Sequence, residues 1–123
     1  MDQALTIDLR EHNTILVGHT RFFVLHQGDQ VHLIRDRCPH RGGPLSLARL
    51  TPDSRRLTCP WHGTRVGLAA LRRTAAPMVR SGERATVVLT GIDDDAPVSV
   101  ARRCILANLP PAGDPGHTQD VPA

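Results

Sequence analysis

The sequence contains no lysine and no tyrosine, and only 2% of its 123 residues are aromatic. Proteins that stack nucleic-acid bases depend on aromatic side chains, so this composition argues against a nucleic-acid partner. No apolar run approaches the roughly 20 residues that span a bilayer, and residues 1–8 are acidic and lack the apolar run of a signal peptide. We therefore expect a soluble cytoplasmic protein with no membrane segment.

Cysteine is scarce as well, with residues at Cys38, Cys59 and Cys104 only. An odd number at these spacings does not indicate a disulfide framework, and it suits a reducing compartment. Cys104 stands beside Ile105 and is expected to be a buried apolar thiol. All fifteen basic residues are arginines, and the net charge is +3. Because guanidinium groups suit planar contacts with carboxylates and phosphates, an acidic partner fits this charge.

Short β-branched and alternating segments, separated by turn residues, fill most of the chain. They predict an all-β fold, an antiparallel sandwich or barrel-like base built as a meander of short strands. Residues 66–73 fit a helical turn and a strand equally well. We expect one domain over residues 1–107 and a disordered Pro/Gly-rich tail over residues 108–123. Strands are predicted near residues 5–7, 14–17, 21–25, 31–34, 56–58, 85–90 and 98–100.

Two pairs of metal-binding residues stand in loops that are too rich in proline and glycine to be regular elements. Cys38 and His40 are separated by one residue, Cys59 and His62 by two, and eighteen residues lie between the pairs. If the two loop tips meet, they present two thiols and two imidazoles to one site. Iron–sulfur clusters need thiolate ligands, and two cysteines with two histidines on one [2Fe–2S] cluster define a Rieske centre.

Two other interpretations of the four residues compete with the cluster. Two cysteines and two histidines also satisfy tetrahedral zinc, although a single-residue Cys-x-His spacing is less common there. The four residues could also be ordinary core or surface groups that bind no metal. A colourless protein that binds zinc would favour the first of these alternatives.

The two loops, residues 38–46 (Cys-Pro-His-Arg-Gly-Gly-Pro-Leu-Ser) and 57–63 (Leu-Thr-Cys-Pro-Trp-His-Gly), resemble the cluster loops of Rieske ferredoxins. These are electron carriers of bacterial ring-hydroxylating dioxygenase systems. The resemblance covers roughly residues 20–80. It implies a fold in which a small two-loop subdomain binds the cluster on an all-β base.

The resemblance also implies roles for individual residues. Cys38 and Cys59 would bind the buried iron, and His40 and His62 the outer iron. Ala76–Pro77 falls where the family has a third loop that covers the cluster. The resemblance also implies residues that surround the cluster. Backbone amides near Gly43 and Gly63 would donate to its sulfurs, and Trp61 would shield it. Thr64 would supply a hydroxyl donor, and Pro77 would belong to the third loop.

The sequence departs from respiratory Rieske proteins in ways that lower the expected redox potential. In respiratory Rieske proteins each loop has an extra cysteine, and the two cysteines form a disulfide. Other residues take these places in this sequence, with Trp61 in the second loop. The tyrosine that raises the potential in those proteins is also absent. Thr64 stands where those proteins have a serine that bonds a cluster sulfide. We expect a potential near the lower end of the roughly −150 to +300 mV range, and a lower one still for Thr64→Val.

Together these features predict one-electron transfer rather than catalysis, with electrons passing from a flavin-type reductase to an oxygenase. Two alternatives are a tightly bound subunit of a larger redox enzyme, with residues 64–73 as its contact, and a cluster-containing redox sensor or interaction module. A self-sufficient oxygenase would need a second, mononuclear iron site, and nothing after residue 80 offers one.

Overall fold

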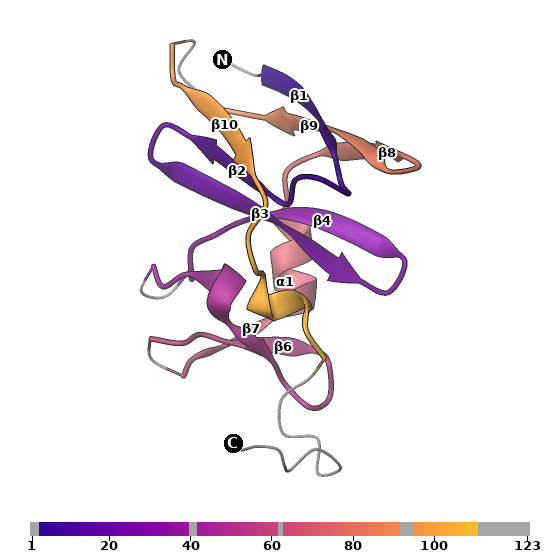
Figure 1. The fold of residues 1–123 in the computed structure, drawn as a ribbon. Helices are drawn as coiled ribbons and strands as arrows, with labels where there is room; N and C mark the ends of the chain where they lie inside the picture. Colours follow the sequence, from indigo (N-terminus) through magenta and orange to yellow (C-terminus); the bar gives the residue numbers. More distant parts are fainter. Residues whose placement is uncertain (1–2, 40–41, 62, 92–94, 111–123) are drawn as a thin grey trace.

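The computed structural model describes residues 3–39, 42–61, 63–91 and 95–110 of the chain (Figure 1). Within these ranges it contains three antiparallel sheets, one α-helix and two short 3-10 helices. The prediction of an all-β fold of antiparallel sheets is confirmed. None of the helices in the described ranges combines the length and the apolar character needed to cross a bilayer.

Two of the sheets stack to form the base of the molecule, which lies in the upper part of Figure 1. The outer sheet has the strand order β1-β9-β8, and the second has the order β10-β2-β3-β4. Their strands are β1 (Gln3–Asp8), β2 (Thr14–Val17), β3 (Thr20–Gln27), β4 (Gln30–Arg35), β8 (Met78–Ser81), β9 (Arg84–Leu89) and β10 (Val98–Ala101).

A small lobe packs on the other face of the second sheet, below it in Figure 1. Its own sheet has the order β5-β6-β7. The helix of the lobe follows β7 directly and packs against β7 and β4. The elements of the lobe are η1 (Leu45–Leu47), β5 (Arg49–Leu50), β6 (Arg56–Thr58), β7 (Arg65–Gly67), α1 (Leu68–Arg73) and η2 (Leu106–Asn108).

The sheet that contains β2, β3 and β4 is the middle layer, and the central part of β3 is buried on both faces. In β3, Val24 faces the core shared with the outer sheet, whereas Phe23 and Leu25 face the core of the lobe. A strand that is covered on both faces has a continuous apolar run instead of an alternating one. This explains the unbroken Phe-Phe-Val-Leu run at residues 22–25.

Residues 66–73, for which the sequence left a strand and a helical turn open, contain both in succession. The strand Arg65–Gly67 ends within this stretch, and Leu68–Arg73 is a helix with Leu68 and Leu71 buried. The prediction of a buried Cys104 was wrong, because this thiol is exposed. The neighbouring Ile105 takes the inward position, and an extended backbone turns adjacent side chains to opposite sides.

Candidate metal centre

Two loops of the lobe carry the candidate ligands, and they project on the same side of the lobe in Figure 1. The first connects β4 to η1 and begins at Cys38. The second connects β6 to β7 and begins at Cys59. His40 and His62, the other two predicted ligands, lie outside the described residues.

The first loop closes on itself through two backbone hydrogen bonds. The Cys38 amide donates to the carbonyl of Gly43 at 2.7 Å, and the Gly42 amide donates to the carbonyl of Cys38 at 2.8 Å. Gly42 has a φ of +77°, in the left-handed region that favours glycine. The glycine therefore lets the loop turn back toward the cysteine with which it began.

The second loop repeats this closure residue for residue. The Cys59 amide donates to the carbonyl of Thr64 at 2.8 Å, and the Gly63 amide donates to the carbonyl of Cys59 at 2.9 Å. Gly63 has a φ of +68°. Both loops are thus the same Cys-Pro-x-x-Gly turn, and the sequence contains this repeat at residues 38–42 and 59–63. The histidine is third in the first turn and fourth in the second.

The two turns meet at Gly43. A Cβ atom placed on this glycine would lie 2.7 Å from Sγ of Cys59 and 3.3 Å from two ring atoms of Trp61. The backbone of the first loop therefore lies directly against the cysteine of the second. Because Gly43 also accepts the hydrogen bond from Cys38, this one residue contacts both cysteine-bearing turns.

Both cysteines are buried in the core of the lobe. Cys38 is 2% exposed and Cys59 is 1% exposed. They belong to the same apolar cluster as Phe23, Leu45 and Leu57. The two thiols therefore sit at the inner end of the turns, where the middle sheet and the lobe pack together and water has little access.

A buried carboxylate fastens the two ends of the first loop. Asp36, whose side chain is 1% exposed, accepts hydrogen bonds from the Ser46 amide at 2.7 Å and from the Ser46 hydroxyl at 2.6 Å. It also pairs with the guanidinium of Arg21 at 2.9 Å. Since residues 36 and 46 bracket the loop, this network fixes the loop on β3. The role of Asp36 is not apparent from the sequence, in which it looks like a solvated charge between Arg35 and Arg37.

The residues predicted to surround the site lie in different settings. Trp61 is 62% exposed, and the inner part of its ring lies against Gly43. Thr64 is half-buried and closes the second turn through its carbonyl. Pro77 is exposed, and its carbonyl accepts a hydrogen bond from the Val88 amide at 2.9 Å. The adjoining Ala76 is bridged to Leu33 of β4.

An open groove of about 480 Å³ lies beside the start of the first loop. Cys38 and Pro39 of the loop line it together with Leu71 of α1 and Thr74, which follows the helix. Arg35 and Arg37 also line the groove, so its lining is partly basic.

Comparison with known protein families gives a match to the Rieske [2Fe-2S] domain over residues 2–81. The chain belongs to this family. Comparison with curated proteins and with solved structures gives no match. A Rieske domain binds a [2Fe–2S] cluster and serves iron–sulfur electron transfer with redox partners. The match ends at Ser81, and β9, which lies between β1 and β8 in the outer sheet, follows it in the chain.

The described residues of the Rieske site fit such a cluster. Two soft thiol donors lie in a shielded core, which suits iron bound to sulfide. Gly43 keeps the space beside Cys59 free of a side chain, as a bulky inorganic group there requires. Each buried thiol also begins a turn that continues, in sequence, to a histidine.

Proposed function

We propose that this Rieske protein carries single electrons from a flavin-type reductase to an oxygenase-type partner. In this proposal Cys38 and Cys59 bind the inner iron, and His40 and His62 bind the outer iron. The protein is a carrier without a catalytic site of its own. We place it in the cytoplasm, because an odd number of cysteines spaced for metal binding suits a reducing compartment.

The observation that supports the proposal is the repeated turn. Two Cys-Pro-x-x-Gly loops close through equivalent hydrogen bonds, begin on buried thiols and meet at Gly43. An ordinary pair of surface loops has no reason to repeat this geometry with a cysteine at the same position. The binding of one cluster by a thiol and an imidazole from each loop explains the repetition.

In this proposal, different residues of the chain have different roles at the cluster. When bound, the cluster supplies a centre that accepts and returns one electron. Cys38 and Cys59 hold it from the apolar core and exclude water on that side. In this proposal, backbone amides of the two loops donate to the cluster sulfurs and so favour the more negative, reduced state. Thr64 adds a hydroxyl at the end of the second turn.

Exchange of each proposed ligand tests the assignment. In Cys59→Ser we expect the iron and acid-labile sulfide content and the visible absorption of the cluster to be lost, because serine is a poor ligand for an iron–sulfur cluster. Cys104→Ser is the matched control, since Cys104 is exposed and free, and it should retain both. His62→Ala paired with His19→Ala makes the same comparison for the imidazoles.

Two results would contradict the assignment. Full cluster content in Cys59→Ser would remove that residue from the ligand set. A colourless parent protein that contains stoichiometric zinc would replace the electron carrier with a structural zinc site.

A further inference from the structure

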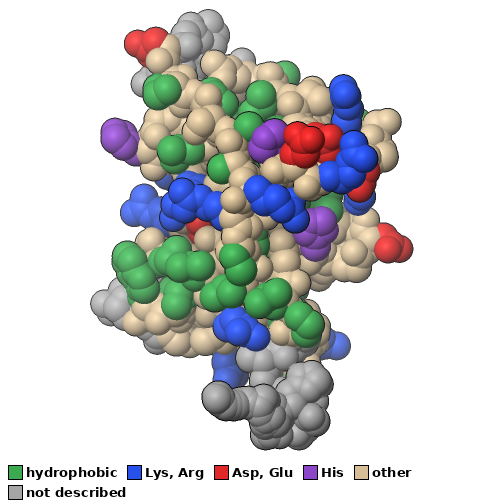
Figure 2. Space-filling view, viewed as in Figure 1, with side chains coloured by type: hydrophobic (Ala, Val, Ile, Leu, Met, Phe, Trp, Pro, Cys, Tyr) green, Lys and Arg blue, Asp and Glu red, His purple; other side chains and the backbone are tan. Residues whose placement is uncertain are grey.

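Positive charge is concentrated in the lobe. Residues 35–76 contain nine arginines and two acidic residues, a formal charge of +7, whereas the rest of the chain contains six arginines and ten acidic residues, a formal charge of −4. Every described arginine of the 35–76 stretch is exposed. On the face drawn in Figure 2, the acidic side chains lie mainly on the upper part of the molecule, whereas arginines lie at the upper right, across the middle and at the lower end.

Three of these arginines share the outer face of the small sheet. Arg49 of β5 and Arg65 of β7 are both paired with Thr58 of β6, so their side chains leave the sheet on the same side. Arg56 lies two residues before Thr58 and shares that side. The opposite side is formed by the buried row of Leu50, Leu57 and Val66. We call Arg49, Arg56 and Arg65 the arginine face.

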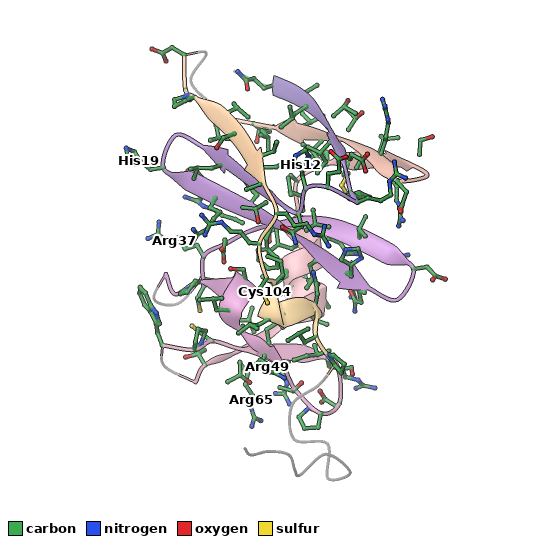
Figure 3. The ribbon with its side chains drawn as sticks, viewed as in Figure 1. His12, His19, Arg37, Arg49, Arg65 and Cys104 are labelled. Atoms are coloured by element: carbon green, nitrogen blue, oxygen red, sulfur yellow. The ribbon has the colours of Figure 1, made fainter. Side chains whose placement is uncertain are left out.

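The arginine face adjoins the second loop. Thr58 immediately precedes Cys59, and Arg65 immediately follows Thr64, the residue that closes the turn. Figure 3 shows Arg49 and Arg65 near each other at the end of the lobe that lies away from the base. A protein that covers these arginines would therefore also lie against the loop that begins at Cys59.

The described part of the chain does little to neutralise this face. Arg56 pairs with the exposed Asp53 at 3.8 Å, and within the described ranges neither Arg49 nor Arg65 has a carboxylate oxygen within 4.0 Å. The remaining acidic residue of the lobe, Asp36, is buried and engaged with Arg21 and Ser46. Like charges at neighbouring positions repel each other and are stabilised when a partner brings carboxylates.

Exposed apolar side chains occur on the same lobe. Trp61 is 62% exposed on the second loop, and Leu47 is 45% exposed on η1. Figure 2 shows hydrophobic side chains gathered on the lower part of the molecule. An exposed tryptophan on the same lobe as exposed arginines is typical of protein-binding surfaces, in which tryptophan and arginine provide most of the affinity.

We propose that the arginine face, with Trp61 beside it, docks an acidic surface of the redox partner. This inference rests on the proposed electron-carrier function, and it names the charge of the partner. A protein occupant fits better than a nucleic acid, because the chain has few aromatic platforms for bases and carries its exposed tryptophan next to the redox site. Guanidinium groups also bind carboxylates through paired hydrogen bonds.

Binding to redox proteins of opposite charge tests the inference. The probes are an oxidised, acidic flavodoxin and a basic cytochrome c, titrated against the cluster-loaded full chain. We expect flavodoxin to bind at low ionic strength, with affinity falling about tenfold or more between about 20 and about 200 mM salt, and cytochrome c to bind more weakly. A single-stranded oligothymidylate is titrated in parallel.

Matched charge variants locate the surface. Arg49→Gln with Arg65→Gln should weaken flavodoxin binding about tenfold, whereas Arg84→Gln with Arg103→Gln removes the same net charge from the base and should change it less than about twofold. Equal effects of the two pairs, tighter binding of cytochrome c or tighter binding of the oligonucleotide would each overturn the inference. Binding needs no electron transfer, so a loaded cluster with no flavodoxin binding would refute the docking surface and leave the carrier function intact.

Discussion

Gly43 is the residue at which the geometry of the site is most constrained. Its carbonyl accepts the hydrogen bond of the Cys38 amide, and its α-carbon faces the thiol of Cys59. The resemblance to Rieske ferredoxins implies a place for Gly43 near the cluster through backbone amides. Its steric role could not be predicted, because only the folded chain shows that Cys59 and Trp61 approach the same atom.

Gly43→Ala should therefore reduce cluster loading. The added methyl group would lie 2.7 Å from Sγ of Cys59, and the buried thiol or the loop must move to relieve the contact, at a cost of about 1–3 kcal/mol. Iron and sulfide analysis measures the loss. Gly67→Ala is the control, because its new Cβ would meet nothing within 4 Å. Equal loading of the two variants would show that the close approach at Gly43 is unimportant.

The first loop is an element fixed at its two ends by one buried carboxylate. In Asp36→Asn the negative charge that pairs with Arg21 is lost. An amide nitrogen also replaces one carboxylate oxygen, and it cannot accept the hydrogen bonds that Arg21 and Ser46 donate. We expect a loss of about 2 kcal/mol in the free energy of unfolding, measured by denaturant titration, together with weaker cluster retention. Asp53→Asn, at an exposed aspartate of the same lobe, should be milder. A stability loss no larger than that of this control would argue against the role of Asp36.

The hairpin of β3 and β4 carries two histidines that make stability depend on pH. Burial, reinforced by Arg80 and Arg102 at His26 and by Arg72 at His32, lowers the pKa of both imidazoles below the ordinary value of 6.5. The unfolded chain therefore binds more protons, so stability is complete above about pH 6.5 and falls as the pH decreases through the lowered values.

Replacement of both imidazoles tests this dependence. His26→Gln with His32→Gln should flatten the decline in the thermal midpoint between about pH 7 and pH 5, relative to the parent protein under the same conditions. The difference between the two proteins at each pH isolates the histidines from other acid-sensitive groups. Parallel curves for the two proteins would show that these imidazoles titrate alike in the folded and unfolded states.

The elements were predictable where local pattern decides them. Alternation and β-branched runs predicted β1, β2, β9 and β10, and the strands predicted near residues 21–25 and 31–34 are the β3–β4 hairpin. The choice between strand and helix for residues 66–73 was not predictable. The burial of Leu68 and Leu71 within the lobe favours the helix, and this burial is a tertiary effect. The burial of Asp36 depends in the same way on residues distant in sequence.

At the scale of the whole molecule, the three layers divide into a structural base and a lobe that carries the candidate site. The outer and middle sheets form an apolar base, and the lobe on the other face of the middle sheet holds both candidate thiols. The charge is unevenly distributed along the sequence, since residues 35–76, which form most of the lobe, carry a formal charge of +7 and the rest of the chain carries −4. The family and its cofactor could be predicted from two short motifs, but the arrangement of the arginines required the register of the small sheet.

The central claim is that two cysteines and two histidines of these loops hold one [2Fe–2S] cluster. Pulsed EPR of the anaerobically reduced full chain measures this directly, because nitrogen ligands couple to the unpaired electron. We predict an average g value below that of four-cysteine ferredoxins and couplings from two nitrogens, and we expect the signal to be lost in His40→Ala and in His62→Ala. A signal without strongly coupled nitrogen, or one unchanged in both variants, would contradict the account.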